Sequence, residues 1–222
     1  MGLNCNMNYF KSSVGRKHLM GLSGLGLSLF VLTHMLGNML LFVGPQAYNS
    51  YSHALVSFEL IYVIEAGLAA LFLVHAVVGI GLARENRKAR SQPYAMATNG
   101  DKAVSIASKS MIYHGLIILV FTIHHLITFK YGTVYTATYN SVEMRDLYRL
   151  VTEVFHNPAY VVWYVVALSF LALHLSHGFS SSFQSIGFNH PRYTPCIKRF
   201  GCVYAVIVAV GFLAPPLVIF FR

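Results

Sequence analysis

The chain alternates between long apolar stretches and shorter polar segments. The apolar stretches cover roughly 19–43, 56–83, 104–130, 155–185 and 201–221. A helix needs about 20 residues to cross the hydrocarbon core of a bilayer, and each stretch reaches that length. Charged side chains are rare inside them, although the second stretch holds Glu59 and Glu65. The pattern predicts an all-α integral membrane bundle of five transmembrane helices, built as one domain from residues 1–222.

The composition agrees with the membrane class. Hydrophobic residues make up 56% of the chain and charged residues only 10%, whereas soluble domains carry about 25% charged residues. Mostly polar residues precede the first apolar stretch, which is longer than the core of a secretory signal and lacks a small-residue cleavage site. We therefore expect the first stretch to remain in the protein as a helix.

The positive charge is distributed unevenly between the polar segments. The net charge of +9 could suggest nucleic acid, but most basic residues gather before the first stretch and in every second segment after it: Lys11, Arg16, Lys17, Arg84, Arg87, Lys88, Arg90, Lys102, Lys109, Arg192, Lys198 and Arg199. The other segments hold Lys130, Arg145 and Arg149, with Arg222 at the end. Basic loops stay in the cytoplasm. We therefore expect no nucleic-acid partner, but a cell inner (cytoplasmic) membrane protein with its N-terminus in the cytoplasm and its C-terminus outside. The basic residues are then topology signals, a partner-docking surface, or both.

Four of the apolar stretches each carry a histidine near one end, and these are His34, His75, His125 and His174. An imidazole in hydrocarbon is expensive unless it has a partner or a function. These four side chains are therefore the first candidates for a functional site.

The four histidines belong to an internal repeat. Aligned without gaps, Met20, Gly24 and His34 of the first stretch match Met111, Gly115 and His125 of the third. The second and fourth stretches share H-x-x-x-G, formed by His75 with Gly79 and by His174 with Gly178. Duplicated halves are a known feature of membrane chains. The alignment also separates His125 from its neighbour His124, and His174 from His177.

The direction of each helix pairs the rings by depth. The first and third helices run outward, which places His34 and His125 at an outer level, whereas His75 and His174 share an inner level. Two ligands at each level suit haem iron, which accepts two axial imidazoles, while zinc wants three or four protein ligands. Gly24, Gly115, Gly79 and Gly178 would make room for the flat ring, although glycines also serve plain helix packing. The sequence therefore predicts two bis-histidine sites, each holding a b-type haem.

Three runs of this chain resemble a known family. They are GLSGLGLSLFVLTHMLGN, VHAVVG and LHLSHGFSSSFQSIG. Together they resemble the dihaem cytochrome b membrane anchor of succinate dehydrogenases and fumarate reductases, in its single-chain, five-helix form. The resemblance extends from about Arg16 to Phe221, and the four histidines match the family's haem-ligand positions. Some members carry a glutamate two residues before the last ligand for transmembrane proton transfer, where this chain has Ala172.

The resemblance implies a larger complex. A flavoprotein subunit with covalently bound FAD would interconvert succinate and fumarate, and an iron–sulfur subunit would relay electrons to the inner haem. This chain would anchor both in the lipid and exchange electrons with menaquinone or ubiquinone. The whole complex could form a dimer. The physiological direction of the reaction stays open.

Quinone chemistry needs a group that takes up protons, and Glu59 and Glu65 are the only acids in the predicted spans. Glu65 precedes His75 by ten residues, which places it near the outer level, with Glu59 closer to the surface. A buried carboxylate can exchange protons. The alternative is a structural glutamate hydrogen-bonded to a serine, a tyrosine or a haem propionate. The 131–154 segment is expected to be a long outer loop that either caps this site or contributes interfacial tyrosines.

Two other functions are compatible with the same histidines. A dihaem anchor of another quinone-linked enzyme, such as a hydrogenase or formate dehydrogenase, would share the histidine pairs, although the paired repeat and the LHLSHG run speak against it. A histidine-bearing membrane transporter would use the same residues without haem, and it would have no visible chromophore.

Overall fold

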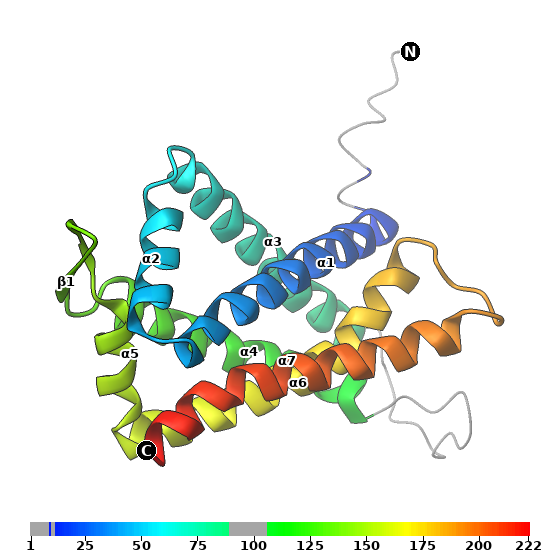
Figure 1. The fold of residues 1–222 in the computed structure, drawn as a ribbon. Helices are drawn as coiled ribbons and strands as arrows, with labels where there is room; N and C mark the ends of the chain where they lie inside the picture. Colours follow the sequence, from blue (N-terminus) through cyan, green and yellow to red (C-terminus); the bar gives the residue numbers. More distant parts are fainter. Residues whose placement is uncertain (1–8, 10–11, 89–105) are drawn as a thin grey trace.

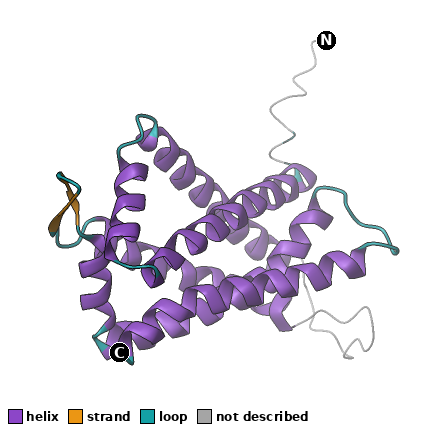
Figure 2. Ribbon diagram, viewed as in Figure 1, coloured by secondary structure: helices purple, strands orange, loops and turns teal. Residues whose placement is uncertain are grey.

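The computed structural model describes Tyr9, residues 12–88 and residues 106–222. This part of the chain is mostly helical, with one small hairpin (Figures 1 and 2). Five of its helical segments are long and apolar enough to cross a membrane: Ser13–Phe42, Ile61–Lys88, Ser110–Lys130, Pro158–Ser185 and Thr194–Phe220. The prediction of a helical, multi-pass membrane protein is confirmed at that level.

The spanning segments are built from five α-helices and two short extensions. The helices are α1 (Ser13–Asn38), α3 (Ile61–Lys88), α4 (Ile106–His125), α6 (Pro158–Ser185) and α7 (Thr194–Phe220). The 3-10 turn η1 (Met39–Phe42) prolongs α1, and the π-helical turn η2 (Leu126–Lys130) prolongs α4. We call the end of the bundle where α1 begins the N-side and the opposite end the C-side.

Helix starts follow the local sequence. Ser12 caps α1, where its Oγ accepts the N–H of Gly15 at 3.0 Å. Asn157 caps α6 in the same way, by accepting the N–H of Ala159 at 2.9 Å, and Pro158 follows at the first helical position. Such caps satisfy backbone donors that have no partner inside the helix, and proline suits that first position because no hydrogen bond is lost.

The C-side carries more structure than the sequence predicted. The expected second helix begins at Ile61 rather than at 56, so Glu59 lies in the exposed turn 57–60 and not inside a span. The preceding polar segment forms the helix α2 (Pro45–Val56). The expected 131–154 loop contains β1 (Thr136–Tyr139), β2 (Val142–Arg145) and α5 (Leu147–Phe155). The helices α2 and α5 are too short to be predicted as membrane-spanning helices.

The geometry of the hairpin turn accounts for the residues found in it. Tyr139 pairs with Val142, so Asn140 and Ser141 form a two-residue loop. Their φ angles are +49° and +65°, as a type I′ turn requires. Asparagine tolerates this left-handed region better than most residues. The residues of the turn therefore suit the left-handed backbone that this hairpin needs.

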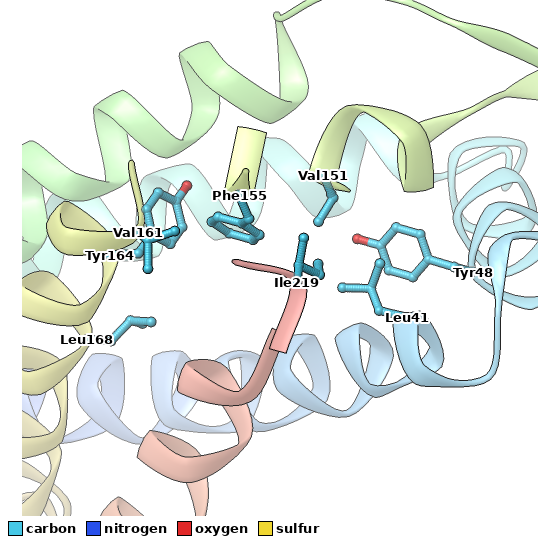
Figure 3. Close-up of a cluster of buried hydrophobic side chains, with 8 residues drawn as sticks. All are labelled: Leu41, Tyr48, Val151, Phe155, Val161, Tyr164, Leu168 and Ile219. Atoms are coloured by element: carbon cyan, nitrogen blue, oxygen red, sulfur yellow. The ribbon is translucent and has the colours of Figure 1, made fainter. Parts of the chain in front are cut away.

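The main apolar core lies at the C-side and ties α2 and α5 to the bundle. Figure 3 shows its buried side chains, which are Leu41, Tyr48, Val151, Phe155, Val161, Tyr164, Leu168 and Ile219. They come from η1, α2, α5, α6 and the end of α7. We call α2, α5 and the β1–β2 hairpin the C-side cap. A second cluster, of Leu175, Tyr204, Ala205 and Val208, joins α6 to α7.

The helix α3 is the least covered of the five. None of its residues is buried, and it packs mainly against α1. Its large apolar side chains, such as Tyr62, Val63 and Val77, are 79%, 68% and 68% exposed. Apolar surface of this extent on a soluble protein would mark an interaction site, whereas on a spanning helix it is the surface that lipid covers.

Candidate functional site

The residues that the repeat aligns make equivalent contacts in the two halves. A Cβ placed on Gly24 of α1 would lie 3.4 Å from Cε1 of His75 on α3, and one on Gly115 of α4 would lie 3.7 Å from Cε1 of His174 on α6. Each histidine thus lies against the glycine of the preceding helix. The missing side chains let these imidazoles approach the helix backbone closely.

The methionines of the repeat complete the match. A Cβ on Gly79 would lie 3.3 Å from Cε of Met20, and one on Gly178 would lie 3.6 Å from Cε of Met111. Since Met20 precedes Gly24 while Gly79 follows His75, α1 and α3 run antiparallel. The second half, α4 with α6, has the same register. The two halves therefore share one three-dimensional arrangement as well as one sequence pattern.

The four imidazoles meet as two pairs, and each pair takes one ring from each half. The rings of His34 and His125 lie 5.8 Å apart between centroids, at an interplanar angle of 89°. Those of His75 and His174 lie 6.2 Å apart at 68°. These are the pairs that helix direction indicated. Among the described residues, no three His, Cys, Asp or Glu side chains gather to hold a metal ion.

The two pairs lie at different levels of the bundle. His75 contacts α1 at Gly24, which is ten residues before His34. At a rise of about 1.5 Å per residue, ten residues separate the levels by about 15 Å. The pair of His75 and His174 is therefore on the N-side, and the pair of His34 and His125 is on the C-side, near the cap.

Hydrogen bonds orient two of the rings. Ser23 donates its hydroxyl to the carbonyl of Leu19 at 2.6 Å, so its oxygen accepts the N–H from Nδ1 of His75 at 3.1 Å. Nδ1 of His125 bonds to the hydroxyl of Tyr164 at 3.0 Å. Groups that hold Nδ1 fix the tautomer and leave Nε2 free for a metal. Sequence reasoning missed Ser23 and Tyr164, because their contacts cross between helices.

The spacing of the two ring pairs is compatible with haem. Two metal–imidazole bonds of about 2 Å each would separate the coordinating nitrogens by about 4 Å and the ring centres by roughly 6 Å. Both ring pairs are near that spacing. Glycines lie against the N-side rings, and a haem supplies its own in-plane ligands, so that two histidines at each level suffice.

The C-side pair is enclosed by aromatic groups and linked to the cap. His34 stacks on Phe30 at 5.5 Å and lies 5.8 Å from Phe212 of α7. Asn38 donates from Nδ2 to the carbonyl of His34 at 2.9 Å and accepts the hydroxyl of Tyr48 at 3.1 Å. Burial, and then the neighbouring tyrosine of α2, raise the pKa of Tyr48, which therefore stays protonated and donates. The cap thus reaches the backbone of His34 through two side chains.

The neighbouring histidines occupy other places. His124 packs on Tyr160 and Trp163 of α6, with ring centroids 5.3 and 6.4 Å away. His177 lies one turn beyond His174 and is partly buried. The repeat separated both residues from the paired rings, and neither joins a pair in the structure.

The two predicted quinone-site acids lie in different settings. Glu65 is on α3 and forms an ion pair with Lys130 of η2, with 37% of its side chain exposed. It is therefore a paired and partly exposed carboxylate rather than a buried one. Glu59 is exposed in the turn before α3. The structure does not bring these two acids together.

Basic side chains gather at the N-side, as the sequence pattern predicted. Arg84, Arg87 and Lys88 end α3 there, and Lys198 and Arg199 lie in the first turns of α7. Arg16 of α1 forms an ion pair with Glu85. Lys11, Arg90 and Lys102 lie outside the described residues. The C-side holds fewer basic groups, Lys130, Arg145, Arg149 and Arg222.

A scan against protein-family models, a search of curated proteins and a search of solved structures each returned no match to this chain. The observations that bear on function are the two histidine pairs, the five helices long enough to span a membrane, and the sequence resemblance.

Proposed function

We propose that this chain is the membrane anchor and electron-transfer subunit of a succinate:quinone or quinol:fumarate oxidoreductase, with two bis-histidine b haems. One observation carries the proposal: the four imidazoles form two pairs, which lie at two levels about 15 Å apart. A histidine that relays protons or serves only a structural role would explain one isolated imidazole. Two pairs with the same spacing, each drawn from both halves of a repeat, support two identical cofactors.

Three groups of residues would ligate the two haems, orient the ligand rings and leave room for the cofactors. When bound, haem supplies a one-electron redox centre whose potential depends on its axial ligands, their hydrogen bonds and its burial. His75 and His174 would hold the N-side group, and His34 and His125 the C-side group. Ser23 and Tyr164 orient two of these rings. Gly24, Gly115, Gly79 and Gly178 leave room beside the N-side pair.

The charge distribution supports the orientation of the proposed complex. Basic residues at the N-side favour a cytoplasmic position for that end in the cell inner membrane, with the C-terminus outside. An iron–sulfur subunit would then dock on the N-side, with the FAD flavoprotein subunit beyond it. The N-side pair is the closer of the two to that partner, and the C-side pair is close to the opposite membrane surface.

Quinone is proposed to react on the C-side. Oxidation of a quinol to a quinone releases two electrons and two protons, so the site needs a proton acceptor. Glu65 precedes His75 by ten residues on α3, about 15 Å towards the C-side, which is the level of His34 and His125. Its ion-pair partner is Lys130, and a carboxylate can accept a proton. Glu59 is a second, more exposed acceptor near the same surface.

Haem content tests the proposal most directly. The full chain, purified in detergent, should contain two protohaems, and both His34→Ala and His75→Ala should contain one. His124→Ala is the matched control, because this histidine lies outside the pairs, and it should contain two. A colourless wild-type chain would refute the proposal and favour a transporter. Copurification of a hydrogenase or formate dehydrogenase instead of a flavoprotein and an iron–sulfur subunit would replace the succinate assignment.

The quinone assignment has its own test. Glu65→Gln keeps the side-chain shape but removes the ionisable group, so both haems and succinate oxidation with artificial dyes should persist while quinone-linked turnover slows. Glu59→Gln is the companion variant. If both variants retain full quinone turnover, the C-side site is wrong and the N-side surface becomes the place to search.

A further inference from the structure

One ion pair joins the two halves of the bundle at the C-side. Nζ of Lys130, the last residue of η2, contacts Oε1 of Glu65 on α3. In the part of the chain that the structure describes, no other ion pair connects α3 to the second half. The two side chains are 38% and 37% exposed, so a molecule that arrives from the lipid can reach both. A lysine ammonium has three N–H donors, and the contact with Glu65 uses one of them.

An uncommon backbone turn places Lys130. In η2 the N–H of Tyr131 bonds to the carbonyl of Leu126, five residues earlier, at 3.0 Å. Such a π-turn holds one residue more than an α-turn, so the residues after it are rotated by about 100° from their places in an unbroken α-helix. Turns of this kind are rare and occur frequently at functional sites. This one begins directly after His125, so Lys130 lies about one turn beyond a ring of the C-side pair.

Two neighbours fix the end of the π-turn. Arg145 of β2 donates from Nη1 to the carbonyl of Lys130 at 3.2 Å and from Nη2 to the carbonyl of Thr133 at 3.4 Å. Carbonyls at the end of a helix lack a partner within it, and this guanidinium supplies one. A Cβ on Gly132 would lie 2.0 Å from the carbonyl oxygen of Thr128, so any side chain there would force the backbone to shift. The C-side cap and this glycine therefore hold the backbone of Lys130.

Stability alone gives little reason for this arrangement. Ion pairs that are partly exposed contribute little to the free energy of unfolding, whereas ionisable side chains in spanning segments usually serve a function. The pair sets an acceptor, the carboxylate of Glu65, beside a donor, the ammonium of Lys130. A quinol has hydroxyl groups that donate to a carboxylate, and a quinone has carbonyl oxygens that accept from an ammonium. The two side chains therefore match both forms of the proposed substrate.

We propose that Lys130 binds an oxygen of the quinone headgroup beside Glu65, and that Arg145 is a positioning residue that keeps Lys130 in place. The inference rests on the proposed function and deepens it, because it adds a binding group to the C-side site where Glu65 accepts protons. Since an ammonium can only donate hydrogen bonds, Lys130 would bind the carbonyl oxygen of the quinone. Loss of this bond should weaken quinone binding and raise the KM, whereas loss of the proton acceptor in Glu65→Gln should lower the kcat.

The test measures succinate-linked reduction of a short-chain quinone analogue by the complex purified with this chain. Lys130→Gln should raise the KM for the analogue about 10-fold, as expected for one lost hydrogen bond from a charged donor, and Lys130→Arg should keep it near the wild-type value. Arg145→Gln should raise the KM by a smaller factor. Arg149→Gln is the matched control, because it removes another C-side cation, which pairs with Glu153 instead, and should leave the KM unchanged. A double variant with Glu65→Gln separates direct binding from an effect through Glu65, since Lys130→Gln should raise the KM in that background too.

An unchanged KM in Lys130→Gln would overturn the inference. So would a KM effect that disappears in the Glu65→Gln background, because Lys130 would then act only through its ion-pair partner. If Lys130→Gln does not assemble, Arg145→Gln decides, since it displaces the lysine but keeps its charge: a raised KM supports the inference and an unchanged KM opposes it. A wild-type chain without two haems, or a complex without succinate-linked quinone turnover, would instead refute the proposed function before the variants are compared.

Discussion

Gly211→Ala should disturb the C-side histidine pair from a helix that carries none of the four ligands. Gly211 lies on α7 against Met35 of α1, the residue directly after His34. A Cβ at this position would lie 2.2 Å from the sulfur of Met35 and 2.7 Å from its Cγ. Ordinary contacts between nonbonded heavy atoms need about 3.5–4.0 Å, so the sulfur must move by more than about 1 Å.

The size of the effect follows from the lack of free space. Met35 is 4% exposed, and although methionine is flexible, its side chain has little room to move into. Overpacking of this kind costs about 1–3 kcal/mol, while alanine regains up to about 1 kcal/mol of helix propensity over glycine. We expect a net loss of stability of up to about 2 kcal/mol, together with weaker retention of the proposed C-side haem.

Thermal unfolding and haem release in detergent provide the assay. Gly67→Ala is the matched control, because Gly67 also lies in a spanning helix but has no atom within 4 Å of the added Cβ. It should be neutral or slightly stabilising. If Gly211→Ala unfolds and releases haem like Gly67→Ala, close packing of α7 does not support His34.

Three further predictions concern hydrogen bonds of individual side chains. Tyr164→Phe removes the group bonded to Nδ1 of His125 and should speed release of the proposed C-side haem about 10-fold without altering the proposed N-side haem in redox titrations; equal shifts in both would contradict a local role. Tyr48→Phe leaves the side-chain oxygen of Asn38 without its donor and should cost about 0.5–1.5 kcal/mol, measured by thermal unfolding; no change would show that the cap is not coupled to α1 through this bond. Glu153 of α5 accepts hydrogen bonds from Tyr135, which precedes β1, and from Arg149 of α5, and both bonds lower its pKa. The contact between Glu153 and Tyr135, which ties the hairpin to α5, should therefore be present above the unfolded-state pKa of Glu153 and be lost as the pH falls through the lowered value. Protease cleavage at the hairpin should therefore rise in acid in the wild type and be pH-insensitive in Glu153→Gln; identical pH profiles would exclude this contact.

The cap shows where sequence reasoning reached its limit. The sequence predicts a loop over 131–154, yet this segment folds into a hairpin and α5, and Pro45–Val56 forms another helix. These elements are short, and their apolar residues find partners far away in the chain, as Tyr48 does in the C-side core. Their burial therefore depends on contacts that no local pattern reveals. The sequence places Glu59 inside a span, whereas it lies in the turn before α3. An apolar run does not show where a turn separates one helix from the next.

The amino-acid sequence was enough to predict a multi-pass helical membrane protein and the levels of its four histidines. Length and hydrophobicity decide whether a segment spans a bilayer, and a constant rise per residue converts the spacing of His34 and Gly24 into depth. The packing of the helices reveals which groups meet between them: Ser23 with His75, Tyr164 with His125, and Lys130 with Glu65. Those contacts depend on how helices rotate and approach one another, which side-chain packing across the whole bundle sets. Haem binding by the paired imidazoles is a prediction that draws on both the sequence and the structure.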